Sequence, residues 1–411
     1  METTLENGIL TIALSGRIDG NNADETAKKL SAALEGQEFE SLHLDAEQLE
    51  YISSAGLRVL LKLKKDTKKQ VHIFNVSDAV YEIFDVTGFT DLLTVHRMPH
   101  EISIIGCKIV GRGTFGTVYR LDNDRIAKIF NTDRAVTLDR IEREKDLARE
   151  VFLQDIPTAI SYDIVRAGSN YGIVFELLEA FSLQDYLMEH SDEEDVMTGK
   201  VADILQHLHH AEIEKYKLND MKQMLLEMFG VFGSFFAEDE MERLTGLFSD
   251  VPERTTLVHG DFHPGNIMVT KKGELVLIDV GDISTGHPLF EFFNMYPSFL
   301  LLQEIEFGTD IVKKDMMKAL NTTTAEETER ACECIKGYWN GLLRHYFAKA
   351  DDGQLAKIES YLKAVGRFKM FTTIARMPNS PEKIEEVRRY KELLLAEWDK
   401  VPPVSEWWIS E

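Results

Sequence analysis

The stretch from His259 to Asp282 holds three side chains whose types and spacing suit phosphate chemistry. Asp261 could accept a proton, while Asn266 and Asp279 could supply the hard oxygen ligands that Mg²⁺ prefers. Phosphoryl transfer needs reactants held in position and phosphate charge neutralised, which metal-bound carboxylate and amide oxygens help to provide. A surface loop rich in Gly, Asp and His is the alternative. However, D-x4-N followed by Asp-x-Gly at the end of an apolar strand is hard to obtain by chance.

Two short strands must bring these groups together. Val269 and residues 275–278 are typical of strands, and the Lys271-Lys272-Gly273 turn between them is a hairpin signal. A hairpin at this position would place both ends of the stretch side by side. We therefore expect Asp261, Asn266 and Asp279 on one rim.

The sequence His-Gly-Asp-Phe-His-Pro-Gly-Asn at 259–266 resembles the catalytic loop of protein kinases. It is more similar to the His-Gly-Asp-x-His-x-x-Asn motif of the aminoglycoside phosphotransferase and choline kinase group. The resemblance implies that Asp261 orients an acceptor hydroxyl and takes its proton, and that Asn266 and Asp279 hold Mg²⁺. It gives supporting roles to His259 and Asp282.

A glycine-rich stretch lies upstream, with Gly111, Gly113, Gly116 and Val118 in the pattern G-x-G-x-x-G-x-V. Dinucleotide-binding folds also use such glycines, but they place a helix directly after them. Here residues 117–121 and 125–130 are β-rich and flank a turn, which predicts a hairpin over the phosphates of ATP. The resemblance to kinases implies that these glycines cover those phosphates.

Lys128 lies in the second of these strands, where kinases place the lysine that binds the ATP phosphates. An edge-strand lysine facing water is the alternative. A kinase also needs a Glu to hold this lysine; residues 135–153 read as a charged helix. Glu142, Glu144 and Glu150 are candidates, and we select Glu144. Residues 171–179 read as the strand and hinge that meet adenine, so Glu176 and Leu178 are assigned to nucleotide binding.

Residues after Asp282 depart from protein kinases, because a helix start follows at once near Gly286 and no Ala-Pro-Glu segment is present. A short connection and an all-helical tail over 288–400 resemble the small-molecule kinases. Aromatic residues of the tail could line an acceptor pocket, although core packing is their commoner role. They are Phe292, Phe293, Tyr296, Phe299, Tyr338, Trp339, Tyr346 and Phe347. Trp407 and Trp408 suggest that the end of the chain docks onto the body or onto a partner.

Residues 1–98 read as a small α/β domain with strands near 8–14, 41–45 and 71–76 and helices near 22–34, 54–69 and 77–88. The segments Gly16-Arg17-Ile18-Asp19, 51–58 and 83–89 resemble the STAS fold of anti-sigma factor antagonists. In antagonists, a partner kinase phosphorylates the first Ser of Asp-Ser-Ser/Thr-Gly-Leu. That Ser corresponds to Ser54, whereas Ser53 replaces the Asp. Phosphate on Ser54 would sit at a helix N-terminus, which favours negative charge; alternatively, both serines only cap the helix.

The composition limits which partners and which cellular compartment are expected. The chain has 411 residues and a formal net charge of −24, which argues against nucleic acid or an anionic membrane as a main partner. Its three cysteines define no disulfide framework, and no signal pattern or long apolar run is present, so we expect a cytoplasmic protein. His207, His209 and His210 crowd one segment, which we interpret as a partly exposed helix face.

The sequence thus predicts an α/β STAS-like N-terminal domain plus an α+β two-lobed protein kinase-like domain with an enlarged helical C-lobe. We place the STAS-like domain at 1–98, a linker at 99–104, the N-lobe at 105–180 and the C-lobe at 181–411. The expected function is transfer of the ATP γ-phosphate to a small hydroxyl-bearing acceptor, with the STAS domain binding an anti-sigma-like or other regulatory protein. Two alternatives are a protein kinase that phosphorylates Ser54 and a nucleotide-sensing module with little catalysis.

Overall fold

The computed structural model describes residues 1–6, 8–113, 115–131, 138–213, 218–293, 324–376 and 380–408. These residues form two compact units. The first contains Met1–Ile104 and Asp163–Tyr171, and the second contains Ile105–Tyr162 and Gly172–Glu411. In the described part of the chain, no helix combines the length and the apolar character needed to cross a lipid bilayer.

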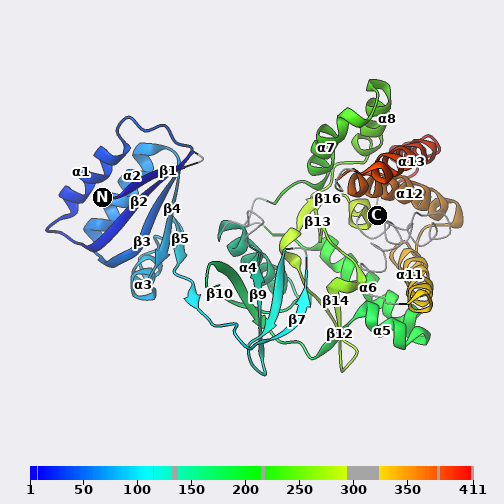
Figure 1. The fold of residues 1–411 in the computed structure, drawn as a ribbon, viewed down its shortest axis with the longest axis horizontal. Coiled ribbons are helices and arrows are strands. Elements are labelled where there is room, and N and C mark those ends of the chain that lie inside the picture. Colours follow the sequence, from blue (N-terminus) through cyan, green and yellow to red (C-terminus); the bar gives the residue numbers. More distant parts are fainter. Residues whose placement is uncertain are drawn as a thin grey trace. The chain divides into compact units, whose positions relative to one another are not determined.

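The first unit is built on a five-stranded sheet in the order β1-β2-β3-β4-β5 (Figure 1). Strand β1 is antiparallel to β2, whereas β2 to β5 are parallel and therefore need helical crossovers. The strands are β1 (Thr3–Glu6), β2 (Ile9–Ile18), β3 (Ser41–Ile52), β4 (Gln70–Val76) and β5 (Thr94–Arg97). The helices are α1 (Ala23–Leu34), α2 (Ser54–Thr67) and α3 (Asp78–Val86). All six elements expected within residues 8–88 are present, and β2 and β3 run further than the pattern indicated.

Alternation along the strands builds the core of this unit. Leu42, Leu44 and Ile73 are fully buried on one face of the sheet. Residues between them, such as His43 and His72, are half-buried on the other face. The expected linker at 99–104 contains a two-residue strand, β6 (His100–Glu101), which pairs in parallel with Val165 and Arg166 of β10 (Ser161–Ala167).

The start of α2 separates the roles of its two serines. The Ser53 side chain accepts hydrogen bonds from the backbone N–H groups of Ala55 (3.2 Å) and Gly56 (3.5 Å), so Ser53 is the N-cap. Ser54 is the first helical residue and is exposed. Capping therefore needs only Ser53, and the Ser54 hydroxyl faces solvent.

Three histidines lie close together on β3, β4 and β5. The His72 Nδ1 and His96 Nε2 atoms are 3.2 Å apart, and the His96 ring stacks on Phe74 at 4.2 Å between ring centres. Burial, together with the nearby His72 and His43, lowers the pKa of His96 to about 3. The sheet therefore holds His96 in its neutral form.

This burial predicts a loss of stability in acid. The pKa of His96 is lower in the folded chain than in the unfolded chain. The unfolded chain therefore binds a proton below about pH 6.5 that the folded chain does not, and the free energy of unfolding decreases as the pH falls below that value. Between pH 7 and pH 5 we expect a loss of about 2 kcal/mol. Urea unfolding of the full chain should show this loss, and His96→Phe should remove it. Equal pH dependence in both proteins would contradict the prediction, and His207→Phe on an exposed helix face is the control.

The second unit begins with an antiparallel sheet in the order β11-β9-β8-β7. Its strands are β7 (Lys108–Arg112), β8 (Gly116–Arg120), β9 (Arg125–Phe130) and β11 (Asn170–Glu176). Helix α4 (Leu138–Leu153) follows β9 in the chain. The expected hairpin after the glycines is therefore present, in place of the helix that a dinucleotide fold requires.

The remainder of the second unit is mostly helical, with small sheets where the chain turns back. Strands β12 (Ala180–Ser182), β14 (Ile267–Thr270) and β15 (Leu275–Leu277) form one sheet, and β13 (Thr256–Val258) pairs with β16 (Ser284–Gly286). The hairpin β14–β15 confirms the expected turn at 271–273. The helices are α5 (Leu183–Glu189), α6 (Glu194–His210), α7 (Met221–Phe232), α8 (Glu238–Ser249), α11 (Ala325–Tyr346), α12 (Asp352–Ala375) and α13 (Pro381–Trp398). Short 3-10 turns are η1 (Ser191–Glu193), η2 (Gly233–Phe235), η3 (Pro264–Asn266), η4 (Val280–Asp282), η5 (Pro288–Phe293) and η6 (Val404–Glu406).

The helical tail uses its aromatic residues mainly as core. Phe292, Tyr338, Trp339 and Tyr346 are buried in one hydrophobic cluster, and Phe347 packs against it. Tyr296, Phe299 and the Phe293 side chain lie outside the described residues. The segment with Trp407 and Trp408 docks onto the rest of the second unit, because Trp407 packs near Tyr361 and Trp408 contacts His287 and Phe347.

Candidate active site

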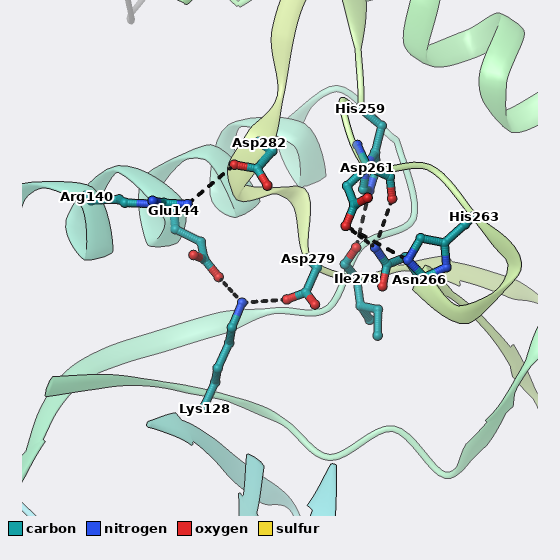
Figure 2. A network of polar contacts seen from close by, with 10 residues as sticks. All are labelled: Lys128, Arg140, Glu144, His259, Asp261, His263, Asn266, Ile278, Asp279 and Asp282. Atoms are coloured by element: carbon teal, nitrogen blue, oxygen red, sulfur yellow. Dashed lines mark hydrogen bonds and ion pairs between the residues drawn. The ribbon is translucent and has the colours of Figure 1, made fainter. Parts of the chain in front are cut away.

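Lys128 lies between two carboxylates that the chain supplies from distant positions. Its Nζ is 2.7 Å from Glu144 Oε1 on α4 and 2.6 Å from Asp279 Oδ1, just after β15 (Figure 2). Of the three glutamates proposed from the sequence, Glu144 is the one that contacts Lys128. Glu144 is 16 positions from Lys128 along the chain and Asp279 is 151 positions from it, yet both carboxylates contact the same amine.

Burial and charge act in opposite directions on this cluster. Burial by itself would lower the pKa of Lys128, but Asp279 and Glu144 outweigh it and raise that pKa to about 12. Burial raises the pKa of Glu144, and the Lys128 ammonium opposes this rise. Lys128 is therefore a permanent cation, suited to bind phosphate oxygens as a point charge.

Local backbone geometry sets the position of Asp279. It adopts a left-handed conformation, with φ 56° and ψ 44°, which is uncommon for a residue other than glycine. Two residues later, a Cβ on Gly281 would lie only 2.6 Å from Cγ of Glu144. A glycine at 281 therefore lets η4 approach α4 closely enough for Glu144 and Asp279 to share Lys128.

The loop after β13 orients Asp261 and Asn266. His259 is fully buried; its Nδ1 accepts from the Asp261 N–H at 3.3 Å, and its Nε2 donates to the Ile278 carbonyl at 3.2 Å. Asn266 Nδ2 donates to the Asp261 carbonyl at 2.9 Å and lies 3.4 Å from Asp261 Oδ2. With the amide nitrogen turned toward Asp261, the Asn266 Oδ1 faces the other way. Figure 2 shows Asp261, Asn266 and His263 gathered at one side of Asp279.

The oxygen donors present fit a magnesium ion. Mg²⁺ usually binds one or two protein oxygens together with phosphates and water, and Asn266 Oδ1 with the second carboxylate oxygen of Asp279 would provide such a pair. Among the described residues, no group of three or more His, Cys, Asp or Glu side chains is arranged to hold a metal ion. This is compatible with a site completed by a nucleotide.

A small pocket brings most of these groups together. Lys128, Glu144, Asp261, Asp279 and Asp282 line it, together with Phe115, Phe130, Arg140 and Gly281. Between β7 and β8, the Gly113 N–H donates to the Gly116 carbonyl at 2.9 Å. A Cβ on Gly116 would lie 2.5 Å from the Ile129 carbonyl oxygen, so no side chain fits there.

Other proposed nucleotide-binding residues lie outside the lining of this pocket. Gly111 and Val118 face each other in the β7–β8 pair, and Leu178 follows β11. Glu176 Oε1 accepts from the Ile160 N–H at 2.8 Å, so the Glu176 side chain has a local structural partner. The backbone of 176–178 remains our proposed contact for adenine.

Sequence reasoning missed several residues beside the site. The Arg140 guanidinium carbon lies 4.8 Å from the centre of the Phe115 ring, and its Nη2 is 3.7 Å from Asp282 Oδ1. On α12, burial lowers the pKa of Lys369, and the carboxylates of Asp261 and Asp282 oppose this shift. Arg140 belongs to a charged helix and Lys369 to a tail helix, so sequence spacing gave no signal for either.

A buried carboxylate supports the catalytic loop from behind. Glu291 in η5 accepts from the backbone N–H groups of His259 at 2.6 Å and Gly260 at 3.3 Å, and its side chain is fully buried. His209 contacts this carboxylate at 3.4 Å and the Tyr346 hydroxyl at 2.5 Å. The expected partly exposed helix face holds for His207 and His210, which face solvent, whereas helical rotation turns His209 inward.

Replacing Glu291 with leucine should destabilise the loop that carries Asp261. The buried N–H of His259 would lose this acceptor, at a cost of about 1–3 kcal/mol, and the partly buried N–H of Gly260 would lose its contact with the carboxylate. Urea unfolding should show this loss, and amide exchange at His259 and Gly260 should speed up. Glu359→Gln, at an exposed position on α12, is the control. Unchanged exchange at both amides would contradict the supporting role.

Comparison with known proteins agrees with the fold. Residues 1–102 match the STAS domain family, and residues 107–310 match the phosphotransferase enzyme family. The chain therefore belongs to the STAS family through its first unit, and its second unit matches the phosphotransferase enzyme family over residues 107–310. It is a kinase-type enzyme that carries a STAS domain.

Relatives of the first unit are anti-sigma factor antagonists. The putative anti-sigma factor antagonist BtrV of Bordetella bronchiseptica is 31% identical over 100 residues, which cover 23% of this chain and 85% of that protein. The anti-sigma F factor antagonist of Paenibacillus polymyxa is 23% identical over 99 residues, with the same coverage.

Solved structures similar to this chain include two aminoglycoside phosphotransferases. The GDP and kanamycin complex of APH(2")-IIia is 14% identical, covers 77% of this chain and 97% of its own, and has a TM-score of 0.42. ADP-bound APH(2'')-Ib is 19% identical, covers 64% of this chain and 94% of its own, and has a TM-score of 0.36. Both TM-scores are below 0.5, so the assignment rests on the family matches and on the site.

Proposed function

We propose that this protein transfers the γ-phosphate of ATP to a hydroxyl group of a small molecule. One observation carries the proposal: Lys128 joins Glu144 and Asp279 within 2.7 Å, in a pocket that Asp261 also lines. A cation for phosphates, oxygen donors for a metal ion and a carboxylate for the acceptor proton are the parts that phosphoryl transfer requires.

Each residue has a role in the proposed mechanism. Lys128 binds the α- and β-phosphates under the turn made by Gly113 and Gly116, and Asp261 orients the acceptor hydroxyl. The hydroxyl oxygen bonds to the γ-phosphorus, the bond from phosphorus to the bridging oxygen breaks, and ADP leaves with that oxygen. The hydroxyl proton passes to Asp261. Mg²⁺ held by Asn266 and Asp279 would neutralise phosphate charge.

The short connection that follows Asp279 favours a small acceptor. Only β16 separates η4 from η5, so this part of the chain contains no long segment on which a peptide substrate could dock. One of the similar structures, an aminoglycoside phosphotransferase, is a complex with GDP and kanamycin. Cys107, Cys332 and Cys334 form no disulfide in the described structure, which suits the cytoplasm, where we place the reaction.

The test is ATP consumption by the full chain with Mg²⁺ and a panel of hydroxyl-bearing metabolites and aminoglycosides. At least one compound should raise ADP formation above the basal rate, and chelation of Mg²⁺ by EDTA should abolish it. Mass spectrometry of the product should show one added phosphate. A chain that neither binds ATP nor forms ADP would contradict the proposal.

A second candidate acceptor is Ser54 of the first unit or of a partner. Its exposed position at the N-terminus of α2 favours this possibility, as Ser53 alone provides the cap. The curated relatives are antagonists of anti-sigma factors, so a regulatory protein is the proposed partner of this unit. Incubation with ATP and peptide mass spectrometry distinguishes the two candidates: phosphate on Ser54 that disappears in Asp261→Asn supports the second, and unmodified Ser54 under active conditions contradicts it.

A further inference from the structure

His263 occupies a defined orientation beside Asp261. It is the N-cap of η3, and its Nδ1 accepts a hydrogen bond from the Gly265 N–H at 3.0 Å. An imidazole nitrogen that accepts a hydrogen bond carries no proton, so the proton of the neutral ring lies on Nε2. A Cβ on Gly265 would come within 2.8 Å of His263 Cε1, so the turn allows the ring to lie against it only with glycine at 265.

The protonated nitrogen faces the carboxylate that receives the acceptor proton. His263 Nε2 is 3.9 Å from Asp261 Oδ2, which is too long for a direct hydrogen bond. Both side chains are partly exposed, 40% for His263 and 48% for Asp261, so solvent reaches both of them. Figure 2 shows the two side chains next to each other. Burial lowers the pKa of His263, and Asp261 opposes this shift. The Nε2–H donor of His263 and the carboxylate acceptor of Asp261 thus face the same space.

We propose that His263 is a further catalytic residue, whose Nε2–H donates a hydrogen bond to the oxygen of the acceptor hydroxyl. This inference rests on the proposed function. The same oxygen donates its proton to Asp261 and uses its remaining lone pair to attack the γ-phosphorus, while the bond to ADP breaks. His263 neither gains nor loses a proton in this step. The hydroxyl would donate one hydrogen bond to Asp261 and accept one from His263. Two hydrogen bonds would fix the direction of the attacking lone pair, whereas one would leave the hydroxyl free to rotate.

Two substitutions separate this role from a purely structural one. His263→Asn keeps a short oxygen that can cap Gly265 but places no donor near the Nε2 position. His263→Gln loses that cap but can extend an N–H to nearly the same place. A structural role predicts that the asparagine variant is the more active, whereas donation to the hydroxyl predicts the opposite order.

The experiment measures phosphate release from ATP·Mg²⁺, with water as the acceptor, in the full chain. We expect kcat to fall at least ~10-fold in His263→Asn and to stay within about threefold of wild type in His263→Gln, with the KM for ATP unchanged. His207→Ala, exposed on α6, should behave as wild type. Thermal midpoints check folding.

Three results would overturn the inference. The first is full activity in His263→Asn, and the second is equal losses in both variants, which would indicate a structural role. The third is a wild-type protein that neither binds ATP nor forms ADP, which would contradict the proposed function itself. Because the first two results require an active wild type, failure of the inference is distinguishable from failure of the function.

Discussion

Replacing Asp261 with asparagine is expected to lower kcat by about 10²- to 10⁴-fold, the contribution typical of a positioned general base. Asparagine has nearly the same shape as aspartate but cannot take the acceptor proton. Lys128, proposed to bind the ATP phosphates, and Asp279, proposed to bind Mg²⁺, remain in place. Turnover assays should therefore show almost no transfer, while isothermal titration with ATP·Mg²⁺ gives a Kd close to that of wild type.

The control for Asp261→Asn is Asp203→Asn, at an exposed position on α6. It makes the same chemical change away from the pocket, so we expect wild-type turnover. Full activity in Asp261→Asn would reject its role as the base. A large loss of ATP affinity would instead mean that Asp261 contributes to nucleotide or metal binding.

Replacing Lys128 with methionine should have the second largest effect. Methionine preserves much of the side-chain length but removes the charge, so we expect kcat to fall by roughly 10²–10³-fold, as for loss of one preorganised charge contact. The affinity for ATP should fall as well. The free energy of unfolding should also decrease, because Glu144 is buried and would remain beside Asp279 without the cation.

A double variant separates these effects. Lys128→Met with Glu144→Gln removes both the cation and the buried carboxylate, so stability should partly recover while transfer remains lost. Urea unfolding and ATP turnover measure the two quantities independently. If the double variant is no more stable than Lys128→Met alone, burial of an unpaired Glu144 is not the source of the instability.

Local sequence was sufficient to locate most of the candidate site. The hairpin at 271–273 follows from two β-rich runs around a Gly turn, and Asp261, Asn266 and Asp279 follow from motif spacing. Lys128 was recognisable because a lysine in an apolar strand after a glycine-rich turn is unusual. Such signals depend only on residues that are close together in the sequence.

Residues that act through tertiary packing left no comparable signal. Glu291 supports His259 from 32 positions away, and His209 reaches Tyr346 across 137 positions. The alternation of exposed and buried histidines on α6 depends on which face of the helix meets the core, and composition cannot specify that face. Likewise, Glu144 could be chosen over Glu142 and Glu150 with certainty only once α4 was placed against η4.

The sequence by itself determined the two families, the order of their elements and the residue types needed for phosphoryl transfer. The tertiary structure decided which carboxylates share the Lys128 amine, which serine caps α2, and which histidine faces Asp261. The physical reason is that residue type and spacing fix local conformation and chemical capability. Charge pairing and burial, in contrast, depend on side chains that only the folded chain brings within a few ångströms.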